Sequence, residues 1–167
     1  MLESNELIIQ QTQNWIRSFI IKFNVCPFAK REINRGTVRF QVSLTTKEDT
    51  ALAELMSEID ILDKQREIET TLVIFPRSFK DFFHYLDFVD LAEKFLVENG
   101  YESIYQIATF HPNYCFADVD FNDVSNYTNR SPYPMLHLLR EESVEKAIDY
   151  YGDTSTIPEK ILQPCKN

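Results

Sequence analysis

The chain has 167 residues, of which 44% are hydrophobic and 26% are charged, and its formal net charge is −9. This length and composition are typical of a globular protein, so we expect residues 1–167 to form a single domain. The negative charge disfavours binding to nucleic acid or to an anionic membrane surface, because both need a surplus of Lys and Arg.

Hydrophobic spacing predicts alternating helices and strands over the first 110 residues. Each helix shows an apolar stripe, and each strand is either alternating or continuously apolar. In chain order, we expect a helix over 7–24, a strand over 37–43, a helix that begins with a capping box at 45–48, a buried strand over 71–75, a helix from an N-cap at Ser78 to Gly100, and a strand over 104–110.

This order of strands and helices is that of a βαβαβ unit with right-handed crossovers. The predicted fold class is therefore α/β, and α+β is the alternative, because three strands make only a small sheet. After Phe110 we expect a polar loop over 111–131, followed by short helices near 133–140, 143–151 and 156–163. The result is a compact domain with a small sheet of three or more strands, an N-terminal helix and a C-terminal helical segment.

The cysteines and the N-terminus indicate a cytoplasmic protein. The three cysteines, Cys26, Cys115 and Cys165, form no CxxC pair, so neither a disulfide framework nor a zinc ribbon is encoded. The first residues lack the basic start and long apolar run of a signal peptide, and no stretch is long enough to span a membrane. We expect no membrane association and predict no cofactor.

Polar and ionisable side chains are concentrated in residues 111–141. Ligands of parallel sheets bind beyond the carboxyl ends of the strands, and the long 111–131 loop follows one such end. If a helix begins after Ser131, its free N–H groups and the guanidinium of Arg130 favour an anion. The alternative is a surface helix with Arg130 paired to a loop carboxylate.

Further residues complete this predicted anion site. Asn129 would bind the anion beside Arg130, and Tyr133 would form a wall of the pocket. Arg77, at the end of a predicted strand, or Arg140, on the predicted helix, would add a second cation. His137 would share a face of that helix with Arg140.

Three residues are candidates for catalysis. His111 follows a strand and titrates near neutral pH, as does His137, so either is suited to transfer a proton. The alternative for His111 is a histidine packed under the loop and hydrogen-bonded to the backbone. Cys26 would be a reactive thiolate if it capped a helix beginning at Pro27, and otherwise a buried structural thiol.

A metal site is not predicted. Asp118, Asp120 and Asn122 are spaced like the start of a calcium-binding loop. The position that requires Gly holds Asp123, however, and the position of the bidentate Glu holds Asn129, which excludes an EF-hand.

Several segments resemble a bacterial family known as domain of unknown function 1415. They are WIR at 15–17, CPFA at 26–29, QIATFHPNYCF at 106–116 and TNRSPYPMLHLLRE at 128–141. The resemblance covers nearly the whole chain and implies a compact bacterial cytosolic protein of about this length, with no particular activity. Cys26, His111, Arg130, His137 and Arg140 lie within these motifs.

The sequence supports two hypotheses about function and does not decide whether the protein is an enzyme or what its oligomeric state is. In the first, an enzyme or binding domain takes a small anionic molecule in one cavity surrounded by His111, Arg130 and His137. In the second, the aromatic side chains of the 111–133 loop form the surface of a non-catalytic protein-interaction module. A concave pocket that holds His111 and Arg130 would favour the first hypothesis, and a convex apolar patch the second.

Overall fold

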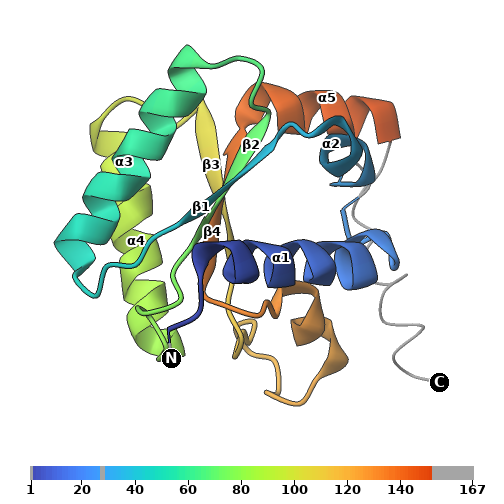
Figure 1. Ribbon diagram of the computed structural model, residues 1–167, viewed down its shortest axis with the longest axis vertical. Coiled ribbons are helices and arrows are strands. Elements are labelled where there is room, and N and C mark those ends of the chain that lie inside the picture. Colours follow the sequence, from blue (N-terminus) through green and yellow to red (C-terminus); the bar gives the residue numbers. More distant parts are fainter. Residues whose placement is uncertain (1, 27–28, 152–167) are drawn as a thin grey trace.

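The computed structural model describes residues 2–26 and 29–151, and it contains helices on both sides of one sheet (Figure 1). The predicted strands are confirmed to within one residue at each end. The elements are α1 (Asn5–Trp15), the π-helix η1 (Ile16–Ile21), α2 (Ala29–Arg35), β1 (Val38–Val42), α3 (Glu48–Lys64), β2 (Thr70–Ile74), α4 (Phe82–Glu98), β3 (Tyr105–Phe110), the 3-10 helix η2 (Val124–Asn129), β4 (Met135–Arg140) and α5 (Glu141–Tyr151).

The sheet is mixed and has the strand order β1-β2-β4-β3. β1 and β2 are parallel, as expected for strands joined by a helix, whereas β4 is antiparallel to both of its neighbours. The predicted α/β class is thus confirmed, but β2 and β3 are not adjacent, because the last strand of the chain is inserted between them.

The predicted helix over 133–140 is wrong, since these residues form strand β4. This strand is paired on both sides and covered on both faces, so its run Met-Leu-His-Leu-Leu shows no alternation. A short apolar run of this kind does not distinguish a central strand from a buried helix. The helix predicted over 143–151 is confirmed as α5, which begins directly after β4, and the helix predicted over 156–163 lies outside the described residues.

Two predicted helix starts are also corrected. α3 begins at Glu48 without a side-chain cap, because the hydroxyl of Thr45 accepts from the N–H of Lys47 instead of from the helix. α4 begins after Asp81, whose carboxylate accepts from the N–H of His84 at 2.9 Å. Ser78 donates to the carbonyl of Thr45 and so joins the two loops that precede these helices.

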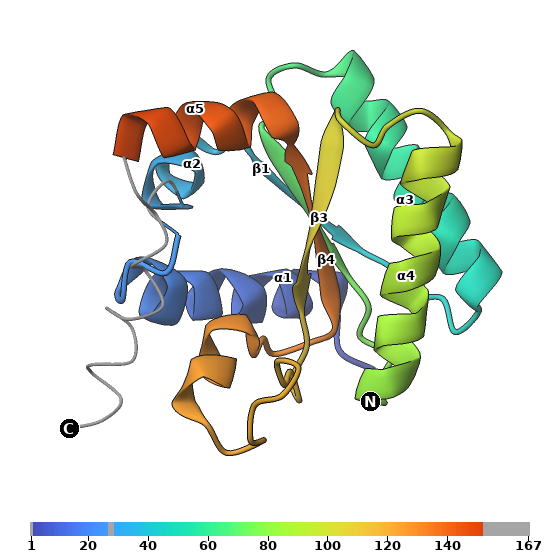
Figure 2. The same ribbon diagram turned by 180° about the vertical axis from the view of Figure 1, so that it is seen from behind.

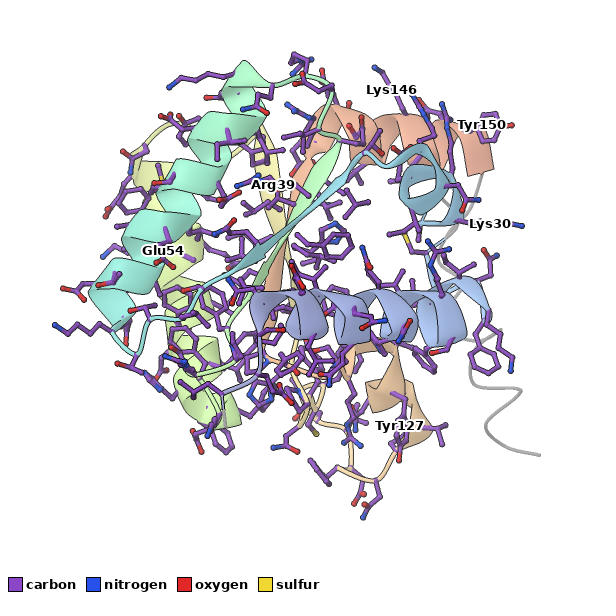
Figure 3. All side chains as sticks on the ribbon, viewed as in Figure 1. Lys30, Arg39, Glu54, Tyr127, Lys146 and Tyr150 are labelled. Carbon is purple, nitrogen blue, oxygen red and sulfur yellow. The ribbon has the colours of Figure 1, made fainter. Side chains whose placement is uncertain are left out.

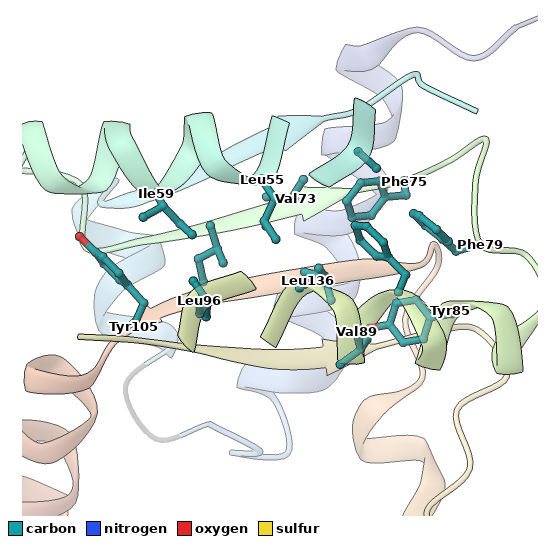
Figure 4. Close-up of a cluster of buried hydrophobic side chains, with 14 of the residues drawn as sticks. Leu55, Ile59, Val73, Phe75, Phe79, Tyr85, Val89, Leu96, Tyr105 and Leu136 are labelled. Carbon is teal, nitrogen blue, oxygen red and sulfur yellow. The ribbon is translucent and has the colours of Figure 1, made fainter. Parts of the chain in front are cut away.

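Helices α3 and α4 cover one face of the sheet and enclose its larger apolar core (Figure 4). Tyr85 of α4 is fully buried there. Its hydroxyl donates to the carbonyl of Met135 at 2.8 Å and accepts from the N–H of Phe110 at 3.0 Å, so the helix is tied to β4 and β3. The side chains at the centre of this core are Leu55, Ile59, Val73, Phe75, Phe88, Leu136 and Leu138.

The opposite face is covered by α1, η1, α2 and α5 (Figures 1 and 2). Successive strand residues point to opposite faces, so Leu136 and Leu138 of β4 enter the larger core, while Met135 and His137 face α1 and α5. A second apolar cluster fills part of this layer, with Ile8, Ile16, Ile20, Leu72, Ile74 and Met135 among its members.

Candidate functional site

A cavity of about 530 Å³ lies in the layer between the sheet and the helices α1, η1, α2 and α5. Its floor is formed by the sheet, where His137 of β4 has Leu72 of β2 and Ala108 of β3 as cross-strand neighbours. Apolar side chains line most of its walls, and they include Trp15, Ile16, Ile20, Val25, Val144 and Ala147.

His137 is the central polar residue of this floor. Its Nε2 lies 2.6 Å from the hydroxyl oxygen of Thr70, and the same oxygen lies 2.6 Å from the carbonyl of Leu138. Burial lowers the pKa of His137 to about 4, because the charged form would lose its hydration there. The imidazole is therefore neutral at pH 7 and acts as a fixed hydrogen-bonding group.

The charged residues of the cavity are concentrated on α2. Arg31 and Arg35 lie one helical turn apart, and both line the cavity while their side chains remain more than half exposed. Glu32 is buried between them, where it accepts from the hydroxyl of Thr37 and lies 3.7 and 3.9 Å from the two arginines. Since these separations exceed hydrogen-bond length, the guanidinium groups retain donors for another anion.

The helical repeat of α5 determines which of its residues line the cavity. Ser143, Val144 and Ala147 lie on one face of α5 and line the cavity. Lys146 also contributes to the lining, and its amine points outward, as does that of Lys30 on α2 (Figure 3). The cations are therefore concentrated on α2, whereas α5 carries Lys146 among four carboxylates, and Glu69 adds a further carboxylate to the lining.

Of the predicted site residues, Cys26 and Asn129 line this cavity together with His137. Cys26 is half-buried against the second apolar cluster. It follows η1, which ends at Ile21, and the carbonyl of Cys26 accepts from the N–H of Ala29 at 3.2 Å. The predicted helix start at Pro27 lies outside the described residues, so the capping role of Cys26 stays a prediction. The side chain of Asn129 donates to the carbonyl of Thr109 at 2.9 Å, which attaches the loop to β3.

His111 lies on the opposite face of the sheet and does not line the cavity. It is fully buried, in ring contact with Phe82 and Tyr85 of α4. Its Nε2 lies 2.7 Å from the carbonyl of Phe79, and its Nδ1 accepts from the N–H of Asn113 at 3.0 Å. Burial lowers its pKa. The expected cavity around His111, Arg130 and His137 is therefore not formed, because a sheet separates the two histidines.

Arg130 braces the 111–131 loop from within. The residues after it form a strand, so the expected anion site at a helix N-terminus is absent. Its Nε donates to the carbonyl of Tyr114 at 3.0 Å, and its Nη2 donates to the carbonyl of Phe121. The guanidinium also lies over the rings of Phe121 and Tyr127, at 4.4 and 4.9 Å from their centroids. Both carbonyls and both rings belong to the loop itself.

This geometry predicts a structural effect of Arg130→Lys. We expect the free energy of unfolding to fall by about 1–2 kcal/mol, because Lys replaces a planar fork and its ring stacking with a point charge. Urea denaturation measures the change, and Arg77→Lys is the control, since Arg77 is exposed and its variant should unfold like the wild type. Equal stability of both variants would contradict the bracing role.

The remaining predicted binding residues are dispersed. The hydroxyl of Tyr133 lies 2.6 Å from the carboxylate of Glu3 and within hydrogen-bond distance of Gln11 Oε1, so it attaches the loop to α1 and to the residues before it. Burial raises the pKa of its hydroxyl to about 12. Arg140 is buried beyond the end of α3, on the face opposite to His137, because the two are three residues apart in a strand and not in a helix. Arg77 lies in an exposed turn after β2.

Sequence reasoning missed Thr70, Arg31 and Arg35, and it missed the π-helix that supplies Ile16 and Ile20 to the cavity. The arginines had a detectable signal, since Arg31 and Arg35 have helical spacing directly after the CPFA motif. Thr70 had none, because its role depends on the pairing of β2 with β4.

Comparison with known proteins identifies a family. A family model described as "Protein of unknown function (DUF1415)" matches residues 7–167. No curated protein and no solved structure matches the chain. Within the described residues, no helix has the length and apolar character needed to cross a membrane, and no group of three or more His, Cys, Asp or Glu side chains is arranged to hold a metal ion.

Proposed function

The chain belongs to the DUF1415 family, and we propose that this domain, which we expect to be bacterial and cytoplasmic, binds a small organic acid with an apolar body in the cavity beside His137. The observation that carries the proposal is a neutral, half-buried histidine on the floor of a largely apolar cavity of about 530 Å³. Cavities of this size, with apolar walls and a few convergent polar groups, are typical of small-molecule sites.

Two features support an acidic group on the ligand. Arg31 and Arg35 present guanidinium donors at the cavity, and Glu32 satisfies them only in part. The planar fork of an arginine donates two hydrogen bonds to a carboxylate or a phosphate, so arginine is well suited to bind an acidic group. An acid would thus lie against α2 with its apolar body above β4.

The π-helix η1 is a further support. π-helical turns are rare, and they occur frequently at functional sites. Here the turn places Ile16 and Ile20 in the cavity wall. The alternative interaction module rests on the exposed rings of Phe121 and Tyr127, but Arg130 lies over both rings and holds them within the loop.

Binding of 8-anilinonaphthalene-1-sulfonate (ANS), a fluorescent aromatic acid, tests the proposal. We expect saturable binding with one site per chain. N-phenyl-1-naphthylamine, which lacks the sulfonate, should bind roughly tenfold more weakly, because it loses the charged hydrogen bonds at α2. The same difference should shrink in the Arg35→Gln variant.

Filling the cavity provides the matched control. Ala108→Leu adds a larger side chain beside His137 and should abolish ANS binding, whereas Ala53→Leu makes the same change on the exposed side of α3 and should leave it intact. Undiminished binding to Ala108→Leu would show that the dye binds elsewhere and would contradict the proposed site.

A further inference from the structure

The hydrogen bonds around His137 determine which group a ligand must present to it, an inference that rests on the proposed function. The hydroxyl oxygen of Thr70 contacts both the carbonyl of Leu138 and Nε2 of His137, each at 2.6 Å. A hydroxyl has one proton, and a carbonyl oxygen can only accept. The proton of Thr70 is therefore donated to Leu138, and Nε2 of His137 must carry its own proton to complete the second contact.

The other ring nitrogen, Nδ1, is then an acceptor. It has no hydrogen-bond partner among the described residues. Three side-chain polar atoms in the described part of the chain are fully enclosed and have no hydrogen-bond partner. They are Ser43 Oγ, Glu54 Oε2 and Thr71 Oγ1, and Nδ1 of His137 is not one of them. Since His137 lines the cavity, Nδ1 meets the open volume with its lone pair. The ring is neutral at pH 7, so this lone pair is available.

We propose that the ligand presents a hydrogen-bond donor to Nδ1 of His137, so that the site selects organic acids that also carry a hydroxyl or an amide N–H. The donor would lie against the sheet, and the acidic group would lie against α2. A ketone or an ether at the same place has no proton to donate. Its lone pairs would face the lone pair of Nδ1 away from water, which is unfavourable. Thr70 is then a positioning residue, because it fixes the tautomer of His137.

A matched pair of acids tests this selectivity. 6-Hydroxy-2-naphthoate and 6-methyl-2-naphthoate have the same carboxylate and rings and nearly the same size, and only the first has a donor. We expect the hydroxyl compound to bind the full-length protein roughly fivefold more tightly in calorimetric titrations, the value of a net hydrogen bond. His137→Phe should bind both acids equally. His84→Phe, on the exposed side of α4, should retain the preference.

The tautomer is measured independently of any ligand. Long-range ¹⁵N–¹H correlation spectra of the protein should show the proton of His137 on Nε2, and Thr70→Val, which frees the choice of tautomer, should reduce the preference for the hydroxyl compound. Equal affinity of the wild type for the two acids, or a proton on Nδ1, would overturn the inference and leave the proposed function standing. If neither acid nor ANS binds, the proposed function itself fails, and this inference fails with it.

Discussion

Replacing Arg140 with Met is expected to lower the free energy of unfolding by about 3–5 kcal/mol, the usual cost of removing one member of a buried charged network. Arg140 is 4% exposed, and its Nη2 lies within hydrogen-bond distance of the carbonyls of Leu62, Gln65 and Ile68. These carbonyls lie at and just beyond the end of α3, where the helix dipole favours a cation. Met fills a similar volume but removes the arginine donor from the carbonyls of Leu62 and Ile68, whereas the carbonyl of Gln65 still accepts from the N–H of Ile68.

Arg66→Met is the matched control for this variant. Arg66 forms an ion pair with Glu142 at 2.6 Å, but both side chains are at least half exposed, so its loss should cost less than about 1 kcal/mol. Guanidinium denaturation of the two variants and the wild type measures both changes. A cost for Arg140→Met as small as that for Arg66→Met would mean that water readily replaces the arginine.

The stability of the protein should fall as the pH is lowered from about 6.5 to 4, and His137 should account for about 3 kcal/mol of the loss. Burial lowers the pKa of His137 from 6.5 to about 4 in the folded state. Between these values the unfolded chain binds a proton that the folded chain does not, so unfolding is favoured as the pH falls. The stability that neutral His137 contributes is fully present above the unfolded pKa of 6.5. It is lost by the time the pH has fallen to the folded pKa of about 4.

His137→Phe isolates this contribution. Phe keeps a ring at the cavity floor and cannot titrate, so the variant should lose less stability than the wild type between pH 7 and 4. Some pH dependence should remain, since burial also lowers the pKa of His111. Urea denaturation at several pH values measures the difference, and parallel curves for the wild type and the variant would contradict a neutral His137 at pH 7.

Local patterns predicted the elements whose neighbours in sequence decide their structure. The alternation over 37–43 and the apolar run over 71–75 indicated β1 and β2, and the stripe of α3 was equally clear. β4 was missed because it pairs with β2 and β3, which are distant in sequence. The hydrophobic pattern of residues 135–140 alone does not indicate these partners. A strand inserted between two others also changed the sheet from parallel to mixed.

The same cause explains the partial prediction of the site. His137 was recognised as a chemical candidate, but its assignment to a helix grouped it with Arg140, whereas the pleat of β4 places them on opposite faces. Arg130 was recognised as important, and its partners proved to be carbonyls and rings of its own loop. The cavity itself depends on how α2 and α5 pack on the sheet, which short-range patterns do not encode.

Amide chemical-shift mapping with ANS tests the central claim, that the cavity between the sheet and α1, α2 and α5 is the binding site. We expect shifts in the ¹H–¹⁵N spectrum that saturate together at Ala108, His137 and Ala147, three cavity residues from three different elements. Shifts confined to the exposed aromatic residues of the 111–131 loop, with the amides of these three residues unchanged, would contradict it.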